Sequence, residues 1–85
     1  MSHFNTNAKK QIRKLPKSVQ IIIGNKIRKL LLSGVKLEKL SGRKNFYKVR
    51  IGDYRIVIVK LSSEIEVVLV AHKKEVYKIL PRLFK

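Results

Sequence analysis

The chain has 85 residues, of which 45% are hydrophobic, so it can form one domain over residues 1–85 with a modest core and cannot hold a second domain. Lysine and arginine number 21 against 5 acidic residues, a formal net charge of +16, which suits a negatively charged partner: nucleic acid, an acidic protein or an anionic membrane surface. The absence of cysteine excludes disulfides and thiolate metal sites, and no apolar run is long enough to cross a membrane, so we expect a cytoplasmic protein.

Two amphipathic helices are predicted for the first part of the chain. Residues 6–15 have apolar positions at helical spacing, with Thr6 or Asn7 placed to cap the helix and Pro16 placed to end it. Residues 17–33 carry a longer apolar stripe, formed by Val19, Ile22, Ile23, Ile27, Leu30 and Leu31. Gly24 weakens this second helix by roughly 1 kcal/mol relative to alanine, which predicts that something packs closely against it.

An antiparallel sheet is predicted for the second half of the chain. Residues 34–45 are rich in Gly, Ser and Asn and indicate an ordered loop. Three strands then follow, over 46–51, 54–60 and 65–71, and residues 75–80 favour a short helix before Pro81. The predicted fold is α+β: two N-terminal helices on one face of a three-stranded meander, to which a short N-terminal strand can add, and a short C-terminal helix.

The first predicted hairpin gathers positive charge. If Gly52 and Asp53 form a two-residue loop, Arg50 opposes Arg55 and Lys48 opposes Val57. Because side chains alternate along a strand, the three cations emerge together on one face, which we call the cationic face. Tyr47, Val49, Ile51, Tyr54, Ile56 and Ile58 emerge on the other face, which is the natural seat for the two helices.

A second tight loop at Ser62 and Ser63 fixes the predicted position of the last strand. It pairs Ile58 with Val67, Ile56 with Leu69, and Arg55 with Val70. His72 then extends the strand on the cationic face, beside Val57, Val59, Val68 and Val70. In the predicted arrangement, the cationic face is left to a partner or ligand.

The cations have two interpretations. They are either solvated charges on a polar strand face or a site for a phosphate. Arginine directly across from arginine is unfavourable by a few tenths of a kcal/mol up to about 1 kcal/mol, so stability alone does not select this pair. An anion bound between the two side chains makes their arrangement favourable. The neighbouring valines are also unusual for a solvated face.

These residues carry a family resemblance. "KLPKSVQ", "KLEKLSG", "YKVRIGDYRIVIV" and "VVLVAHKKEVYK" together resemble the RelE branch of the RelE/ParE toxins of bacterial and archaeal toxin–antitoxin pairs. The resemblance implies a toxin that enters the ribosome and cuts mRNA without a metal or cofactor, through attack of a ribose 2′-hydroxyl on the adjacent phosphate. It implies a labile antitoxin as the protein partner and leaves the oligomeric state open.

The resemblance also implies roles for individual residues. Lys48 and Arg50 lie beside the 2′-hydroxyl and the phosphate, and Arg55 stabilises the transition state. Tyr77 stacks on a base or orients the phosphate. Arg50 stands where the family often has lysine, and an arginine is a poor base but a good phosphate clamp. Lys73 stands where the family often has arginine and is itself a candidate acid.

His72 is the other candidate for proton transfer, because histidine titrates nearest to neutral pH. Two further functions stay open at this point. One is a ParE-like toxin that inhibits DNA gyrase by binding it, and the other is a catalytically weak RNA-binding homologue. The acidic residues form no pair with catalytic spacing, which disfavours an enzyme driven by carboxylates.

Overall fold

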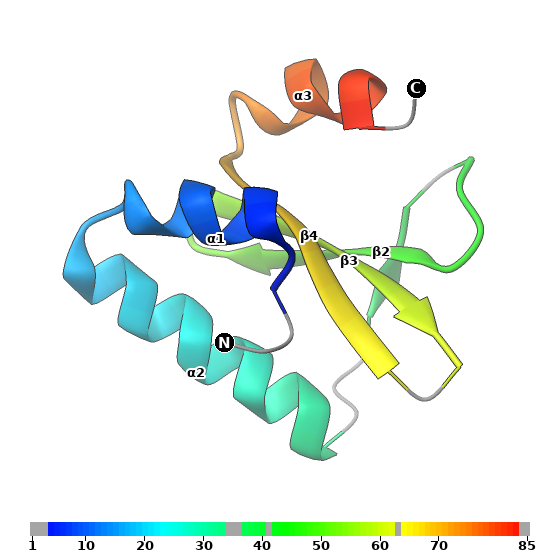
Figure 1. Ribbon diagram of the computed structural model, residues 1–85, viewed down its shortest axis with the longest axis horizontal. Coiled ribbons are helices and arrows are strands. Elements are labelled where there is room, and N and C mark those ends of the chain that lie inside the picture. Colours follow the sequence, from blue (N-terminus) through cyan, green and yellow to red (C-terminus); the bar gives the residue numbers. More distant parts are fainter. Residues whose placement is uncertain (1–3, 34–36, 41, 63, 84–85) are drawn as a thin grey trace.

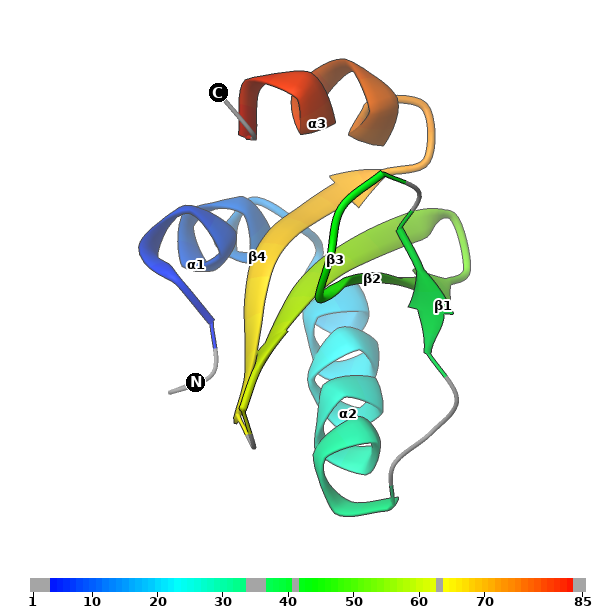
Figure 2. The same cartoon turned by 90° about the vertical axis from the view of Figure 1, so that its right-hand side faces the viewer.

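The helices and strands follow the predicted α+β order. The structure, a computed structural model, describes residues 4–33, 37–40, 42–62 and 64–83. Its elements are α1 (Thr6–Arg13), α2 (Lys17–Ser33), β1 (Glu38–Lys39), β2 (Phe46–Ile51), β3 (Tyr54–Leu61), β4 (Glu64–His72) and α3 (Val76–Leu83). The strands form one antiparallel sheet in the order β1-β2-β3-β4, with α1 and α2 on one side and α3 on the other (Figures 1 and 2).

The fourth strand comes from an unexpected part of the chain. Residues 38–39, predicted to be loop, pair with β2 at one edge of the sheet. The possible N-terminal strand is reduced, in the part of the chain that the structure describes, to a single parallel bridge between Phe4 and Val67 at the opposite edge. Residues 1–3 lie outside the described residues. The N-terminal segment therefore protects the β4 edge with very little pairing.

The N-cap of helix α1 lies one residue before the first of the two predicted caps. The Asn5 side chain accepts a hydrogen bond from the Ala8 backbone N–H at 2.8 Å, so Asn5, rather than Thr6 or Asn7, is the N-cap. Ala8 and Ile12 are buried, as the spacing predicted. This helix also holds the sheet, because the Gln11 side chain accepts a hydrogen bond from the Val70 backbone N–H at 2.7 Å.

Helix α2 has the predicted bounds but a narrower buried stripe. Ile23, Ile27 and Leu30 are buried, whereas Ile22, which was assigned to the stripe, is 55% exposed. The prediction of close packing at Gly24 is wrong, since a Cβ built there meets nothing within 4 Å. The glycine thus weakens the helix without a packing benefit.

The α1/α2 face of the sheet holds the main core. Its buried members on β2 and β3 lie at alternate positions, as the period of two requires, whereas its two members on β4 are three residues apart. They are Val49, Ile51, Ile56, Ile58, Val67 and Val70, and they pack against Phe4, Ala8, Ile12, Ile23, Ile27 and Leu30.

The predicted β2–β3 hairpin is confirmed. Ile51 pairs with Tyr54 around a two-residue loop, and Gly52 has a φ of 56°, a conformation that favours glycine. Arg50 pairs with Arg55, and Lys48 with Val57, as the register predicted. Lys48, Arg50 and Arg55 therefore share one face of the sheet.

The register between β3 and β4 departs from the prediction at a β-bulge. Ile58 pairs with Val67 as expected. The next pair joins Val57 to Leu69, which leaves Val68 as an extra residue on β4. Two predicted pairs are therefore wrong: Ile56 pairs with Val70 instead of Leu69, and Arg55 pairs with Ala71 instead of Val70.

The bulge moves the end of β4 to the other face. Val70 belongs to the main core, and His72 pairs with Tyr54, whose ring it meets edge-on at 5.7 Å between centroids. Because paired residues point to the same side, His72 lies on the Tyr54 side, away from the cations. The prediction that Val70 and His72 extend the cationic face is wrong.

Helix α3 covers part of the face that was expected to stay open. Val57, Val59, Val68, Leu69 and Ala71 of the sheet pack with Val76 and Leu80 of α3 in a second buried cluster. The helix also continues through Pro81, beyond its predicted end, with Pro81 in its last turns. These valines are thus buried by the chain itself, whereas the cationic end of this face, at Arg50, is exposed. In the described residues, no helix is long and apolar enough to span a membrane.

Candidate nucleic-acid interface

The candidate site begins with a row of side chains on β2. Phe46, Lys48 and Arg50 occupy alternate positions and so point to the same side of the sheet. Phe46 packs against the second buried cluster, under α3, while Arg50 is exposed. The row therefore runs from a buried end beneath α3 to a charged end at the hairpin.

The two arginines at the hairpin end are held differently. The Arg55 Nη1 donates hydrogen bonds to the carbonyl oxygens of Gly52, at 2.9 Å, and of Tyr54, at 3.0 Å. These bonds fix the guanidinium of Arg55 against the hairpin loop. Among the described residues, Arg50 makes no side-chain hydrogen bond or ion pair. One of the opposed arginines is thus fixed in place and the other is available to an anion.

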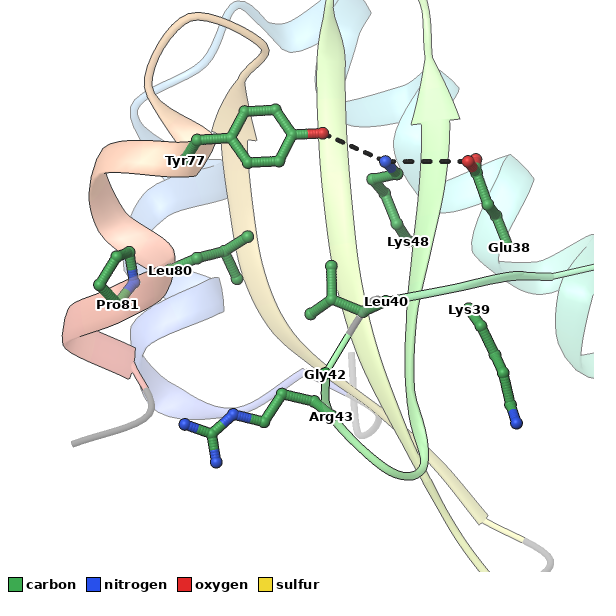
Figure 3. Close-up of a pocket in the computed structure, with 9 residues that line it drawn as sticks. All are labelled: Glu38, Lys39, Leu40, Gly42, Arg43, Lys48, Tyr77, Leu80 and Pro81. Carbon is green, nitrogen blue, oxygen red and sulfur yellow. Dashed lines mark hydrogen bonds and ion pairs between the residues drawn. The ribbon is translucent and has the colours of Figure 1, made fainter.

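Lys48 connects three elements. Its Nζ donates a hydrogen bond to the Tyr77 hydroxyl at 3.1 Å and lies 3.8 Å from the Glu38 carboxylate (Figure 3). The same Nζ lies 5.7 Å from the centroid of the Tyr77 ring, within cation–π range. These contacts join β2 to β1 and to α3, and Lys48 and Tyr77 are 29 positions apart in the sequence.

A pocket of about 640 Å³ opens beside this lysine. Leu80 and Pro81 of α3 form one wall, and Leu40, Gly42 and Arg43 of the segment after β1 form the other. Figure 3 shows Leu40 and Leu80 facing one another across it, with the Tyr77–Lys48–Glu38 contacts along one rim. The pocket therefore joins apolar walls to a polar rim, which suits a flat ring attached to a charged group.

Lys73 lies beside the hairpin loop, at the end of the row that is away from the pocket. Its Nζ is 3.5 Å from the Asp53 carboxylate, and its backbone N–H donates to the Asp53 carbonyl at 2.8 Å. Both side chains are about half exposed or more, at 48% and 67%, so this ion pair adds little stability. It does fix the turn after β4 against the hairpin loop.

The predicted site residues are thus only partly brought together. Lys48 touches Tyr77, Arg50 is paired with Arg55, and Lys73 lies at the same hairpin. His72 stands apart, with its Nδ1 accepting a hydrogen bond from the Lys74 backbone N–H at 3.1 Å.

Sequence reasoning missed the residues contributed by the β1 segment. Glu38, Leu40 and Arg43 line the pocket, although the stretch was predicted to be loop. The available signal was small: Glu38 is a lone acid among basic residues, and two leucines flank its strand. A strand of two residues does not produce a recognisable alternation.

The arrangement has the parts that bind and polarise a phosphate diester. Guanidinium and ammonium groups neutralise phosphate oxygens, and arginine binds them in a two-point fashion. An exposed tyrosine beside such cations offers a surface on which a base can stack. The cationic face therefore has the chemistry of a site for single-stranded nucleic acid.

Comparison with known proteins identifies the family. The family model described as the ParE toxin of the type II toxin–antitoxin system parDE matches residues 3–77. The chain belongs to the RelE/ParE family of type II toxins. A search of the curated proteins gave no match.

Solved structures place this toxin near the RelE branch. The chain is similar to RelE in the RelB–RelE antitoxin–toxin complex from Methanococcus jannaschii, with 28% identity, a TM-score of 0.78, and coverage of 92% of this chain and 98% of that one. It is also similar to the isolated RelE toxin of E. coli, with 26% identity, a TM-score of 0.72, and coverage of 96% and 95%. A third match, to an E. coli RelE variant with an antitoxin RelBc peptide, has 28% identity, a TM-score of 0.71, and coverage of 91% and 88%.

Proposed function

We propose that this toxin is a metal-independent endoribonuclease that cuts mRNA on the ribosome and so inhibits translation. The observation that supports the proposal most directly is the pairing of Arg50 with Arg55 on the face that also carries Lys48 and Tyr77. Two opposed arginines repel one another, so the pair is stabilised by an anion between them. A phosphate of RNA is such an anion.

The proposed reaction is an internal transfer within the RNA. The 2′-oxygen forms a bond to the adjacent phosphorus, and the bond from phosphorus to the 5′-oxygen of the next nucleotide breaks. The proton of the 2′-hydroxyl goes to a base, and the 5′-oxygen receives a proton from an acid. The products are a 2′,3′-cyclic phosphate and a 5′-hydroxyl, and the charge that gathers on the phosphate is stabilised by cations.

The side chains take the following proposed roles. Arg55, fixed by the hairpin carbonyls, stabilises the transition state, and Arg50 clamps the phosphate. Lys48 lies beside the phosphate and the 2′-hydroxyl, and Tyr77 stacks on a base. Lys73 gives a proton to the leaving 5′-oxygen from the hairpin end of the site. His72 is not included, because it lies on the Tyr54 side of the sheet.

The proposed partners are the ribosome with its mRNA and a cognate antitoxin. The net charge of +16 suits docking among the phosphates of ribosomal RNA, and such binding weakens steeply as salt rises. Two of the similar RelE structures are complexes with the antitoxin RelB or its peptide, which supports an antitoxin as the protein partner.

Arg55→Ala tests the proposed reaction. We expect the variant to cut a reporter mRNA about 100-fold more slowly or worse, because it removes a group aimed at transition-state charge. Primer extension on a translated mRNA, with and without ribosomes, measures the cleavage. Arg28→Ala is the matched control, since Arg28 is exposed on α2 and lies outside the proposed site.

Equal cleavage by Arg55→Ala and the wild type would contradict the proposal. RNA binding without any cleavage by the wild type would instead identify a catalytically weak homologue.

A second candidate function is inhibition of DNA gyrase, because the matching family model is that of ParE toxins. This function requires binding to gyrase but no phosphate chemistry. Measuring whether translation or DNA supercoiling fails first after induction separates the two candidates. Loss of supercoiling ahead of translation would favour the ParE-like function.

A further inference from the structure

We propose that Glu38 is the base that takes the proton of the 2′-hydroxyl. This inference rests on the proposed ribonuclease function. The reaction requires a base, and the predicted set of cations lacks one. It comes from the pairing of β1 with β2, which sets Glu38 directly opposite Lys48.

The position of Glu38 is fixed by anchors on both sides of the sheet. Leu37 packs against the main core, and Leu40 packs against the second cluster under α3. The Leu40 backbone N–H also donates to the Phe46 carbonyl at 2.9 Å. The short β1 strand therefore crosses the sheet edge with one apolar anchor per face, and Glu38 lies between these anchors on the cationic side.

The carboxylate lies beside Lys48 at the β1 edge of the proposed site and is open to substrate. Its oxygen is 3.8 Å from the Lys48 Nζ, yet 59% of its side chain is exposed, against 19% for that of Lys48. A ribose next to a phosphate held by Lys48 and Arg50 can therefore reach the carboxylate. The charged or titratable groups around the same pocket are Lys39, Arg43, Lys48 and Tyr77.

The other candidates for the base fit less well. Arg50 and Arg55 stay protonated in proteins. The Lys48 Nζ already donates a hydrogen bond to the Tyr77 hydroxyl and is paired with the Glu38 carboxylate at 3.8 Å. His72 lies on the other side of the sheet.

Asp53 is the remaining carboxylate near the row. It belongs to the hairpin loop, and both its carboxylate and its carbonyl are engaged by Lys73. It lines no part of the pocket beside Tyr77. Asp53 is thus placed beside the proposed acid, whereas Glu38 is placed beside the proposed site of attack.

With Glu38 as the base, both proton transfers of the step are assigned to residues. The Glu38 carboxylate accepts the proton as the 2′-oxygen bonds to phosphorus, and Lys73 donates a proton to the 5′-oxygen as its bond to phosphorus breaks. Proton exchange with water afterwards restores both groups. The reaction needs no other reactant.

The test compares Glu38→Gln with the wild type in single-turnover cleavage of ribosome-bound mRNA across mildly acidic to neutral pH. We expect a rate loss of about 100-fold or more, because a general base contributes at least that factor. The wild-type rate should rise with pH through the acidic range, and this rise should vanish in Glu38→Gln. Glu38→Asp should recover part of the rate and the acidic rise.

The controls separate this role from a structural one. Glu66→Gln removes the same charge from an exposed position on β4 and should leave the rate unchanged. Asp53→Asn should keep the acidic rise. Ribosome co-sedimentation and thermal unfolding show whether Glu38→Gln still binds and folds.

Wild-type rates from a folded, ribosome-bound Glu38→Gln would overturn the inference, as would an acidic rise that persists in this variant. Either result leaves the ribonuclease function standing if Arg55→Ala is inactive. If the wild type itself leaves the mRNA intact, the ribonuclease function fails and the role of Glu38 fails with it.

Discussion

The two faces of the sheet differ in their residues and in the helices that cover them. The α1/α2 face holds the main core and is covered by two helices. The opposite face is apolar only beneath α3, and its other end carries Lys48, Arg50 and Arg55. One face therefore carries the main core of the fold, while the other combines a small core with a charged site.

The difference explains how a small domain holds repelling charges together. Arg50 and Arg55 are placed side by side by the hairpin, whose register depends on the apolar residues of the α1/α2 face. Val57, next along the cationic face, is fully buried under α3. The charged site is thus positioned by packing that lies behind it and beside it.

Ile58→Ala should have the largest effect on stability. Ile58 is fully buried in the main core, so truncation should lower the free energy of unfolding by about 2–5 kcal/mol. Leu80→Ala should cost less, because α3 is one short helix that can shift to fill the space. Urea unfolding followed by circular dichroism measures both. A larger loss for Leu80→Ala would mean that the two faces contribute in the opposite order.

Gly24→Ala, on helix α2, should increase the stability of the protein. A Cβ at this position meets nothing within 4 Å, so we expect unfolding to require about 0.5–1 kcal/mol more free energy. Thermal and urea unfolding measure the change, with Lys26→Ala as a neighbouring exposed control, since lysine and alanine differ little in helix propensity. A destabilised variant would show that α2 makes a close contact at this position.

Arg50→Met should have the smallest effect on stability and separate stability from function. Removing one of two opposed arginines should raise the free energy of unfolding by a few tenths of a kcal/mol, up to about 1 kcal/mol. Cleavage of ribosome-bound mRNA should fall at the same time, since the phosphate clamp is lost. Paired unfolding and primer-extension measurements test this. A variant that loses stability would show that Arg50 supports the fold.

Much of the fold follows from local patterns. Helix α2 has its predicted bounds because its apolar spacing and its flanking Pro16 are local signals. The β2–β3 register follows from a two-residue loop at Gly52 and the strict alternation on either side of it. The same signals predict that the three cations share one face.

The parts that were missed depend on contacts between distant segments. The bulge at Val68 lies where Asn5 donates to the Val67 carbonyl at 2.9 Å and Gln11 accepts from the Val70 N–H. Such a bulge shifts every later side chain to the other face, which is why His72 was misplaced.

The sequence by itself determined the hairpin and its charges, because a tight turn and a period of two act between neighbouring residues. Only the tertiary structure decided the β4 bulge, the cover that α3 gives the valines, and the placement of Glu38 against Lys48. These features arise where segments far apart in the chain bury apolar surface together, and no local pattern encodes that choice of partner.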